Sequence, residues 1–280
     1  MRSKPSGRAP AGPAVGGPGR PRPVPAGTVV AAVGAVTAIA LATLTGCGAA
    51  AGEQGKATTR HTVVVLAASS LTESLTAIAG DFEASHPGTD VQLSFASSST
   101  VVTQVNQGAP ADLIALAGTS AMGPLGQSRI VRGSARTLAA NTLEIATPPA
   151  NPGRVGALAD LSRPTLKVVL CAATAPCGKA AATTLTAAGV VAHVVSYETD
   201  VKATLAKVRL GEADAAIVYH SDVVSAGQSV HGVQIPASVN QRLEYPLVRL
   251  TDDPTAVSFV TFALSDRGRS RLRDHGFLLP

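Results

Sequence analysis

Apolar and polar positions alternate in a regular way between residues 61 and 280. Short continuous apolar runs, such as Val63–Leu66, are typical of strands that are buried on both faces. Apolar residues at helical spacing, such as Leu71, Leu75 and Ile78, predict helices between those strands. The pattern predicts strands at 61–66, 91–95, 112–116, 143–146, 167–170, 191–197, 215–219 and 247–250, and helices at 70–85, 98–107, 178–188, 201–210 and 254–275.

The order of these elements is a repeated β-α-β unit, which predicts an α/β fold with a parallel-rich sheet covered by helices on both sides. Two stretches, 108–116 and 211–219, share a glycine, an Ala-Asp pair and an apolar strand. We therefore expect two similar α/β lobes, formed by residues 61–140 plus 245–280 and by residues 141–244. The strands at 143–146 and 247–250 are expected at the crossings between them. Ser70 and Glu73 fit a capping box at the start of the first helix.

Residues 1–46 read as an export signal and not as part of the fold. A leader rich in Arg, Pro and Gly precedes an uncharged apolar run, 28–46, which is typical of secretory signal peptides. The run ends in Leu-Thr-Gly before Cys47, which resembles a lipobox and predicts a lipid-modified Cys47. The alternative is an uncleaved membrane helix, since about 19 apolar residues are long enough to span a bilayer. Residues 47–60 are expected to be a flexible tether.

The positive charge of the chain belongs to this leader. The formal net charge is +5, but residues 1–46 hold five basic residues and no acid, which leaves 18 basic and 18 acidic residues in the remainder. Only 3% of the residues are aromatic. A nucleic-acid partner needs a basic surface or aromatic stacking platforms, so we expect none.

Two cysteines remain beside Cys47. Cys171 and Cys177 lie six residues apart, and in an exported protein such a pair is expected to form a disulfide. Free thiols are the alternative. A metal site would need further ligands nearby, and the sequence shows none, so we expect no bound metal cation.

Candidate binding residues follow the predicted strands, where ligands sit in open parallel sheets. They offer hydroxyl groups or the unpaired backbone N–H groups of helix starts, which together suit an anion without any cation. The alternative for each serine is a simple helix cap. No carboxylate is clearly placed to accept a proton from the ligand, which favours a fully deprotonated oxyanion. Asp200 precedes a helix and is interpreted as its N-cap, with a role as proton acceptor as the alternative. The candidates are Ser69, Ser70, Ser97, Ser98, Ser99, 176–178, Val201 and Tyr219.

An exported enzyme is the main alternative class. The sequence contains no Gly-x-Ser-x-Gly elbow and no His-Glu-x-x-His motif. Asp112, Asp200 or Asp222 could act with His220, but no spacing singles out a catalytic pair. We therefore predict no catalytic residues.

Four segments resemble one family, the molybdate-binding proteins of ABC transporters. They are Ala-Ala-Ser-Ser-Leu-Thr at 67–72, Phe-Ala-Ser-Ser-Ser-Thr at 95–100 with Gly-Ala-Pro-Ala-Asp-Leu at 108–113, Ala-Ile-Val-Tyr-His-Ser-Asp at 216–222, and Glu-Tyr-Pro at 244–246. The resemblance extends over roughly residues 60–280. It implies a type II periplasmic-binding-protein fold, whose two α/β lobes close over a tetrahedral oxyanion.

The resemblance also implies a ligand set, formed by the side chains of Ser70, Ser98 and Tyr219 and the main-chain N–H groups of Cys177 and Val201. The doublet Ser69-Ser70 leaves the first position open by one residue. Cys177 stands where the family usually has Ala. His220 stands where Gly is frequent, and it is interpreted as an exposed neighbour of the site, with a pH-dependent affinity as the alternative.

The function implied by the resemblance is capture of molybdate, and of tungstate, for an ABC permease and its ATPase. No cofactor is expected. We expect a monomer that is extracytoplasmic and anchored to the cell membrane by lipid on Cys47. Binding of sulfate or another oxyanion is the alternative within the same class.

Overall fold

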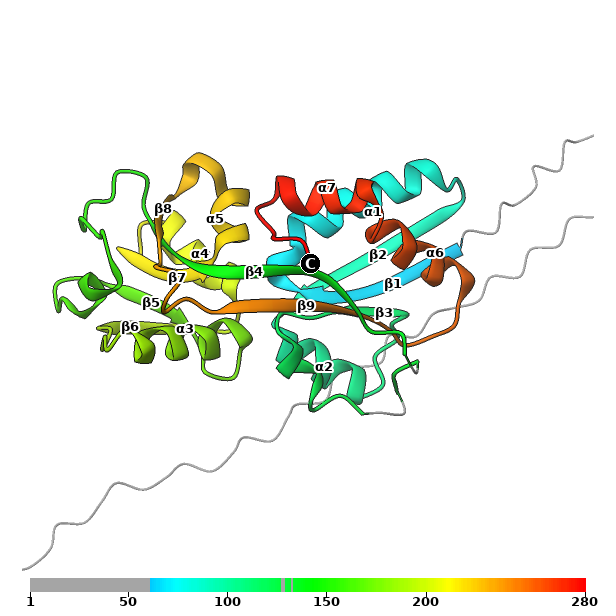
Figure 1. Ribbon diagram of the computed structural model, residues 1–280, viewed down its shortest axis with the longest axis horizontal. Helices are drawn as coiled ribbons and strands as arrows, with labels where there is room; N and C mark the ends of the chain where they lie inside the picture. Colours follow the sequence, from blue (N-terminus) through cyan, green and yellow to red (C-terminus); the bar gives the residue numbers. More distant parts are fainter. Residues whose placement is uncertain (1–60, 127–128, 132) are drawn as a thin grey trace, which may run out of the picture. The chain divides into compact units, whose positions relative to one another are not determined.

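The computed structural model describes residues 61–126, 129–131 and 133–280. The expected signal peptide, Cys47 and the tether to residue 60 lie outside this part of the chain. Within it, nine strands form one sheet in the order β2-β1-β3-β9-β4-β7-β5-β6, with β8 paired to β4 (Figure 1). The strands are β1 His61–Ala68, β2 Thr89–Ala96, β3 Leu113–Ala115, β4 Arg136–Thr147, β5 Val168–Cys171, β6 Val194–Glu198, β7 Ala215–Tyr219, β8 His231–Gln234 and β9 Arg242–Arg249.

The sheet is parallel in two places and antiparallel where these meet. β1 pairs in parallel with β2 and β3, and β5 pairs in parallel with β6 and β7. β4 and β9 run antiparallel to each other and connect the two parallel parts, β9 through β3 and β4 through β7. Figure 1 shows both as long strands that pass from one part to the other. The predicted parallel-rich α/β architecture with crossing strands is confirmed.

Helices cover both faces of each parallel part. α1, α6 and α7 lie on one face of β1 and β2, and α2 lies on the other; around β5 and β7, α4 and α3 take opposite faces (Figure 1). α1, α2, α3, α4 and α6 bury apolar side chains in the two hydrophobic clusters of the core. The helices are α1 Thr72–Ser85, α2 Ser98–Asn106, α3 Pro176–Ala187, α4 Val201–Arg209, α5 His220–Ala226, α6 Pro254–Ala263 and α7 Asp266–Asp274, with short 3-10 turns at Ser69–Leu71, Thr119–Met122, Leu158–Ser162 and Gly227–Ser229.

The crossing strands are longer than the sequence predicts. β4 covers twelve residues where only 143–146 are apolar enough to read as a strand. The difference comes from Asn141, a polar side chain that interrupts the apolar pattern before residue 143 although it is buried. The short strand β8 and the helix α5 are absent from the predicted elements. The predicted tail helix, 254–275, is two helices, because Ser265 caps a new helix through the N–H group of Gly268.

The predicted capping box at Ser70 and Glu73 is wrong. Neither the 3-10 turn at Ser69–Leu71 nor α1 has a side-chain cap. Ser70 bonds to Tyr245 and Glu73 to Lys202, partners that lie far away in the sequence. Tertiary contacts have therefore replaced the local cap.

No helix in the described ranges has the length and apolar character that crossing a membrane requires.

Candidate functional site

A small cavity lies where the strands' carboxyl ends meet helix starts from both parallel parts of the sheet. Its volume is about 10 Å³, about the minimum that holds a water molecule. All five residues of the expected ligand set line it. The full lining is Ala68, Ser69, Ser70, Ala96, Ser97, Ser98, Ala117, Ala175, Pro176, Cys177, Asp200, Val201 and Tyr219.

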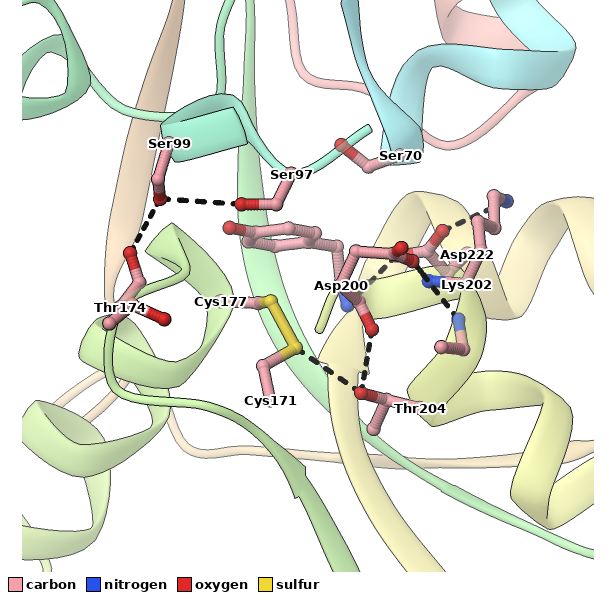
Figure 2. The surroundings of a disulfide bond; sticks show 12 residues. Ser70, Ser97, Ser99, Cys171, Thr174, Cys177, Asp200, Lys202, Thr204 and Asp222 are labelled. Atoms are coloured by element: carbon pink, nitrogen blue, oxygen red, sulfur yellow. Dashed lines mark hydrogen bonds and ion pairs between the residues drawn. A yellow bond between two sulfur atoms is a disulfide. The ribbon is translucent and has the colours of Figure 1, made fainter. Parts of the chain in front are cut away.

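The three serines at the start of α2 have different hydrogen-bond partners. Ser98 Oγ accepts a hydrogen bond from the N–H group of Ala117 at 2.8 Å, so its own proton remains available to the cavity. Ser97 donates to Ser99, and Ser99 donates to the carbonyl oxygen of Thr174 (Figure 2). Of the three, Ser98 is thus the one whose hydroxyl proton is free for a ligand.

The first loop contributes Ser69 and Ser70, and both line the cavity. Ser70 is 3% exposed, and its Oγ lies 3.0 Å from the phenol oxygen of Tyr245 on β9. In the sequence, Tyr245 stands out only as part of the Glu-Tyr-Pro motif, which predicts no role for its side chain. Its contact with Ser70 joins residues 175 positions apart, which no local pattern reveals.

The start of α4 presents one backbone N–H group to the cavity. Asp200 Oδ1 accepts from the N–H groups of Lys202 and Ala203, at 2.8 and 3.0 Å. The interpretation of Asp200 as the helix cap is therefore confirmed. Since the cap takes the second and third N–H groups, that of Val201 at the first helical position stays unpaired.

The start of α3 is held against the end of β5. Cys171 and Cys177 form a disulfide, and Cys171 Sγ also lies 3.3 Å from Thr204 Oγ1 (Figure 2). Gly178 packs so tightly on the backbone of 171–172 that a Cβ atom would collide with the carbonyl oxygen of Ala172. The N–H group of Cys177 belongs to the first turn and has no acceptor within the helix. The loop is thus rigid and offers main-chain donors.

Tyr219 ends β7 and supplies an unusual buried group. Its side chain is 2% exposed, and its hydroxyl group finds no hydrogen-bond partner among the described residues. Burial raises the pKa of this phenol well above its ordinary value, so the hydroxyl keeps its proton. A buried donor without an acceptor costs free energy, which a ligand in the cavity would recover.

No Lys, Arg or His lines the cavity. The ammonium of Lys202 turns away from it and bonds to Glu73 on α1 at 2.7 and 2.9 Å and to Asp222 on α5 at 2.9 Å. The contact with Asp222 is an ion pair without good hydrogen-bond alignment. Burial opposes the charge of Lys202, but the two carboxylates outweigh burial and raise the pKa of Lys202. Sequence reasoning did not find this cluster, which joins elements on opposite sides of the cavity.

His220 lies outside the cavity, directly after Tyr219, and is partly exposed. Its side chain is 34% exposed, and its Nδ1 lies 2.6 Å from Oε2 of the buried Glu144. The hydrogen bond with Glu144 raises the pKa of His220 against the opposing effect of burial. Gln234 donates to the other carboxylate oxygen of Glu144. His220 therefore ties α5 to β4 and β8.

The remaining candidates for acid–base chemistry have structural partners. Asp112 accepts from the N–H group of Val64 and from the hydroxyl of Thr251, and Asp222 accepts from the N–H group of Tyr219. In the part of the chain that the structure describes, no three His, Cys, Asp or Glu residues gather as metal ligands. The cavity offers donors for binding and no paired acid and base.

Comparison with known proteins agrees with this geometry. The family model described as bacterial extracellular solute-binding protein matches residues 63–278. The chain belongs to this family. Family membership supports a binding protein rather than an enzyme, since the curated relatives are solute-binding proteins.

Curated relatives carry a more specific name. The molybdate-binding protein ModA of Mycobacterium tuberculosis is 36% identical over 253 residues, which cover 88% of this chain and 97% of that protein. ModA of Haemophilus influenzae is 30% identical and covers 77% of this chain and 89% of its own length. The resemblance to the molybdate-binding family is confirmed.

Solved structures show the same fold. The periplasmic molybdate-binding protein of Azotobacter vinelandii superposes with a TM-score of 0.70 at 21% identity, covering 78% of this chain and 99% of that one. The sulfate-binding protein SubI of Mycobacterium tuberculosis gives a TM-score of 0.69 at 18% identity, covering 78% and 86%. The predicted periplasmic-binding-protein fold is confirmed.

The cluster around Lys202 predicts unequal contributions of its two carboxylates to stability. Asp222 is fully buried and also accepts from a backbone N–H group, so Asp222→Ala should lower the free energy of unfolding by about 3 kcal/mol. Glu73 is partly exposed, so Glu73→Ala should cost less than about 1 kcal/mol. Urea denaturation of the two variants measures both values, and equal losses would contradict the assignment.

The pair of His220 and Glu144 predicts a pH-dependent stability. Because the pKa of His220 is higher in the folded chain, the pair's contribution is fully present below about pH 6.5, the unfolded value, and is lost as pH rises through the folded pKa. The melting temperature of the wild-type chain should therefore exceed that of His220→Gln at low pH and approach it at high pH. In a Glu144→Gln background, the effect of His220→Gln on the melting temperature should no longer depend on pH. A difference in melting temperature between wild type and His220→Gln that does not change with pH would refute the pairing.

Proposed function

We propose that this protein captures molybdate, and also tungstate, and delivers it to the permease and ATPase of an ABC transporter. The observation that carries the proposal is the cavity, in which the hydroxyls of Ser70, Ser98 and Tyr219 and the N–H groups of Cys177 and Val201 converge without a cation. The names of the curated relatives support molybdate as the ligand.

The donors are sufficient for a small dianion. A hydrogen bond to a charged partner contributes about 1.5–3 kcal/mol, and five such bonds come from four helix starts and one strand end. Asp200 is the one carboxylate in the lining, and its Oδ1 is occupied as the cap of α4. A fully deprotonated oxyanion fits this set, and a protonated one leaves its O–H group facing donors.

Entry of the anion requires the two sides of the cavity to separate. We propose lobes at 61–140 plus 245–280 and at 141–244, which hinge at the crossing strands β4 and β9. Hydrogen bonds between the two proposed lobes in the described residues include Lys202 to Glu73 and Ser99 to the carbonyl of Thr174. They would add to the stability of the closed state, and the ligand's own bonds would shift the population further toward it.

The proposed location of this activity is outside the cytoplasm. We propose that residues 1–46 are removed and that lipid on Cys47 holds a monomer at the cell membrane, with residues 47–60 as a tether of about 50 Å at most in extended form. Such a tether lets the folded part reach a permease in the same membrane.

Calorimetric titration with molybdate, tungstate, sulfate and phosphate tests the ligand. We expect molybdate and tungstate to bind, with sulfate excluded by its smaller size. Preferred binding of sulfate would instead support a sulfate-binding function, as in the name of SubI.

Ser98→Ala and Tyr219→Phe should each weaken molybdate binding by about 1–3 kcal/mol. Ser99→Ala is the matched control, because its hydroxyl is committed to Thr174, and it should cost at most about 1 kcal/mol. Unchanged affinity in both site variants would refute the site.

Substitution of the proposed lipid-bearing residue tests the anchor. Cys47→Ser should move the protein from the membrane fraction to the soluble extracytoplasmic fraction, because one acyl-bearing cysteine is then lost. Fractionation followed by immunoblotting measures the change. A variant retained in the membrane would show an uncleaved apolar helix at 28–46 instead.

A further inference from the structure

Tyr245 connects the proposed anion site to the interior of the crossing strands. It is fully buried on β9, and its phenol oxygen lies 3.0 Å from Ser70 Oγ and 3.4 Å from Asn141 Nδ2 on β4. Asn141 in turn contacts Ser221 on α5. These side chains form a continuous buried chain that ends at a serine of the cavity.

The orientation of Asn141 is fixed by backbone donors. Its Oδ1 accepts from the N–H groups of Thr142 at 3.0 Å and Ser221 at 3.4 Å. The reversed amide would point its NH₂ group at these two donors and leave both without an acceptor. The NH₂ group therefore faces Ser221 Oγ and the phenol oxygen of Tyr245, and Asn141 is the donor to Tyr245.

The direction of the next hydrogen bond follows from this one. A phenol carries a single proton. The 3.0 Å contact with Ser70 Oγ by itself allows either oxygen to donate; with Tyr245 accepting from Asn141, the phenol proton can be directed to Ser70. Burial raises the pKa of Tyr245 well above its ordinary value, so this proton stays on the phenol.

Ser70 is thereby made an acceptor on its inner side. Its own proton has no other acceptor among the described residues, and Ser70 lines the cavity. Ser98 is arranged in the same way, except that the inner donor is the backbone N–H group of Ala117. Two serines of the cavity thus each receive a hydrogen bond from behind.

We propose that Asn141 and Tyr245 are positioning residues that fix the direction of the Ser70 hydroxyl, so that the site presents a proton there and rejects oxyanions that carry a proton of their own. This inference rests on the proposed function. It assigns a role in selectivity to two residues outside the ligand set, both on the crossing strands.

Reversing the direction of the hydrogen bonds that connect Asn141, Tyr245 and Ser70 tests the proposal. In Asn141→Asp the carboxylate can only accept, so Tyr245 donates to it and accepts from Ser70, which then turns lone pairs toward the cavity. Molybdate affinity should fall about 10–100-fold, the loss of one charge-assisted hydrogen bond. The double variant Asn141→Asp, Tyr245→Phe keeps the added charge but breaks the link to Ser70, and most of the lost affinity should return.

Calorimetric titration with molybdate compares the two variants with the wild-type chain, and circular dichroism checks that each is folded. An equal loss in the single and double variants would show an effect of charge alone and overturn the inference. Unchanged affinity in Asn141→Asp would overturn it as well. If the wild-type chain fails to bind molybdate, the proposed function is itself wrong; if it binds without rescue in the double variant, only this inference is.

Tyr245→Phe alone provides a measurement that does not depend on a buried aspartate. It frees the Ser70 hydroxyl to accept as well as donate, so the ratio of the dissociation constants of monohydrogen phosphate and molybdate should fall several-fold. The titrations are run at a pH where the monohydrogen dianion predominates. An unchanged ratio would contradict the proposal, because a merely structural tyrosine would weaken both anions alike.

Discussion

An anion can be held without a cation only where each polar group that faces it points a proton at it, and this constraint on hydrogen-bond direction governs the cavity. A hydroxyl points its proton at the anion when its oxygen already accepts a hydrogen bond from the protein, as Ser98 Oγ does from the N–H group of Ala117. A helix start satisfies it when the cap leaves one N–H group free, as Asp200 does for Val201. The buried hydroxyl of Tyr219 has no partner among the described residues and is available in the same way.

The crossing strands supply the direction that the local loops cannot. Asn141 and Tyr245 lie on β4 and β9, the two strands that belong to both parallel parts of the sheet. A buried polar side chain needs hydrogen-bond partners. The hydrogen bonds between side chains of the two strands therefore form only when the strands keep their register. The strands that would act as the hinge therefore also hold the group that orients Ser70.

Local signals in the sequence predicted the elements whose partners are local. The strand at 215–219 and the start of the helix at Val201 agree with the structure, since an apolar run and an aspartate cap are read from neighbouring residues. The capping box at Ser70 and Glu73 failed because both side chains bond to residues more than a hundred positions away. The length of β4 was hidden for the same reason, since the buried Asn141 looks like a surface residue until its partner is known. The cavity residues could be named from motifs, but the hydrogen-bond directions that prepare them could not.

The cluster of Lys202, Glu73 and Asp222 matters for selectivity because it keeps a positive charge out of the cavity lining. Lys202 directly follows Val201 in the first turn of α4, and its long side chain would otherwise be a source of positive charge close to an anion in the cavity. Two carboxylates hold the ammonium away, and together they carry more negative charge than Lys202 carries positive. A free ammonium would attract any anion in proportion to its charge, because Coulomb attraction does not depend on the arrangement of oxygen atoms. With that charge neutralised, only an anion whose oxygens meet the fixed donors recovers the cost of leaving water. Selection then depends on hydrogen-bond geometry and cavity size, and the same cluster, by joining α1 to α4, favours the closed arrangement in which that geometry exists.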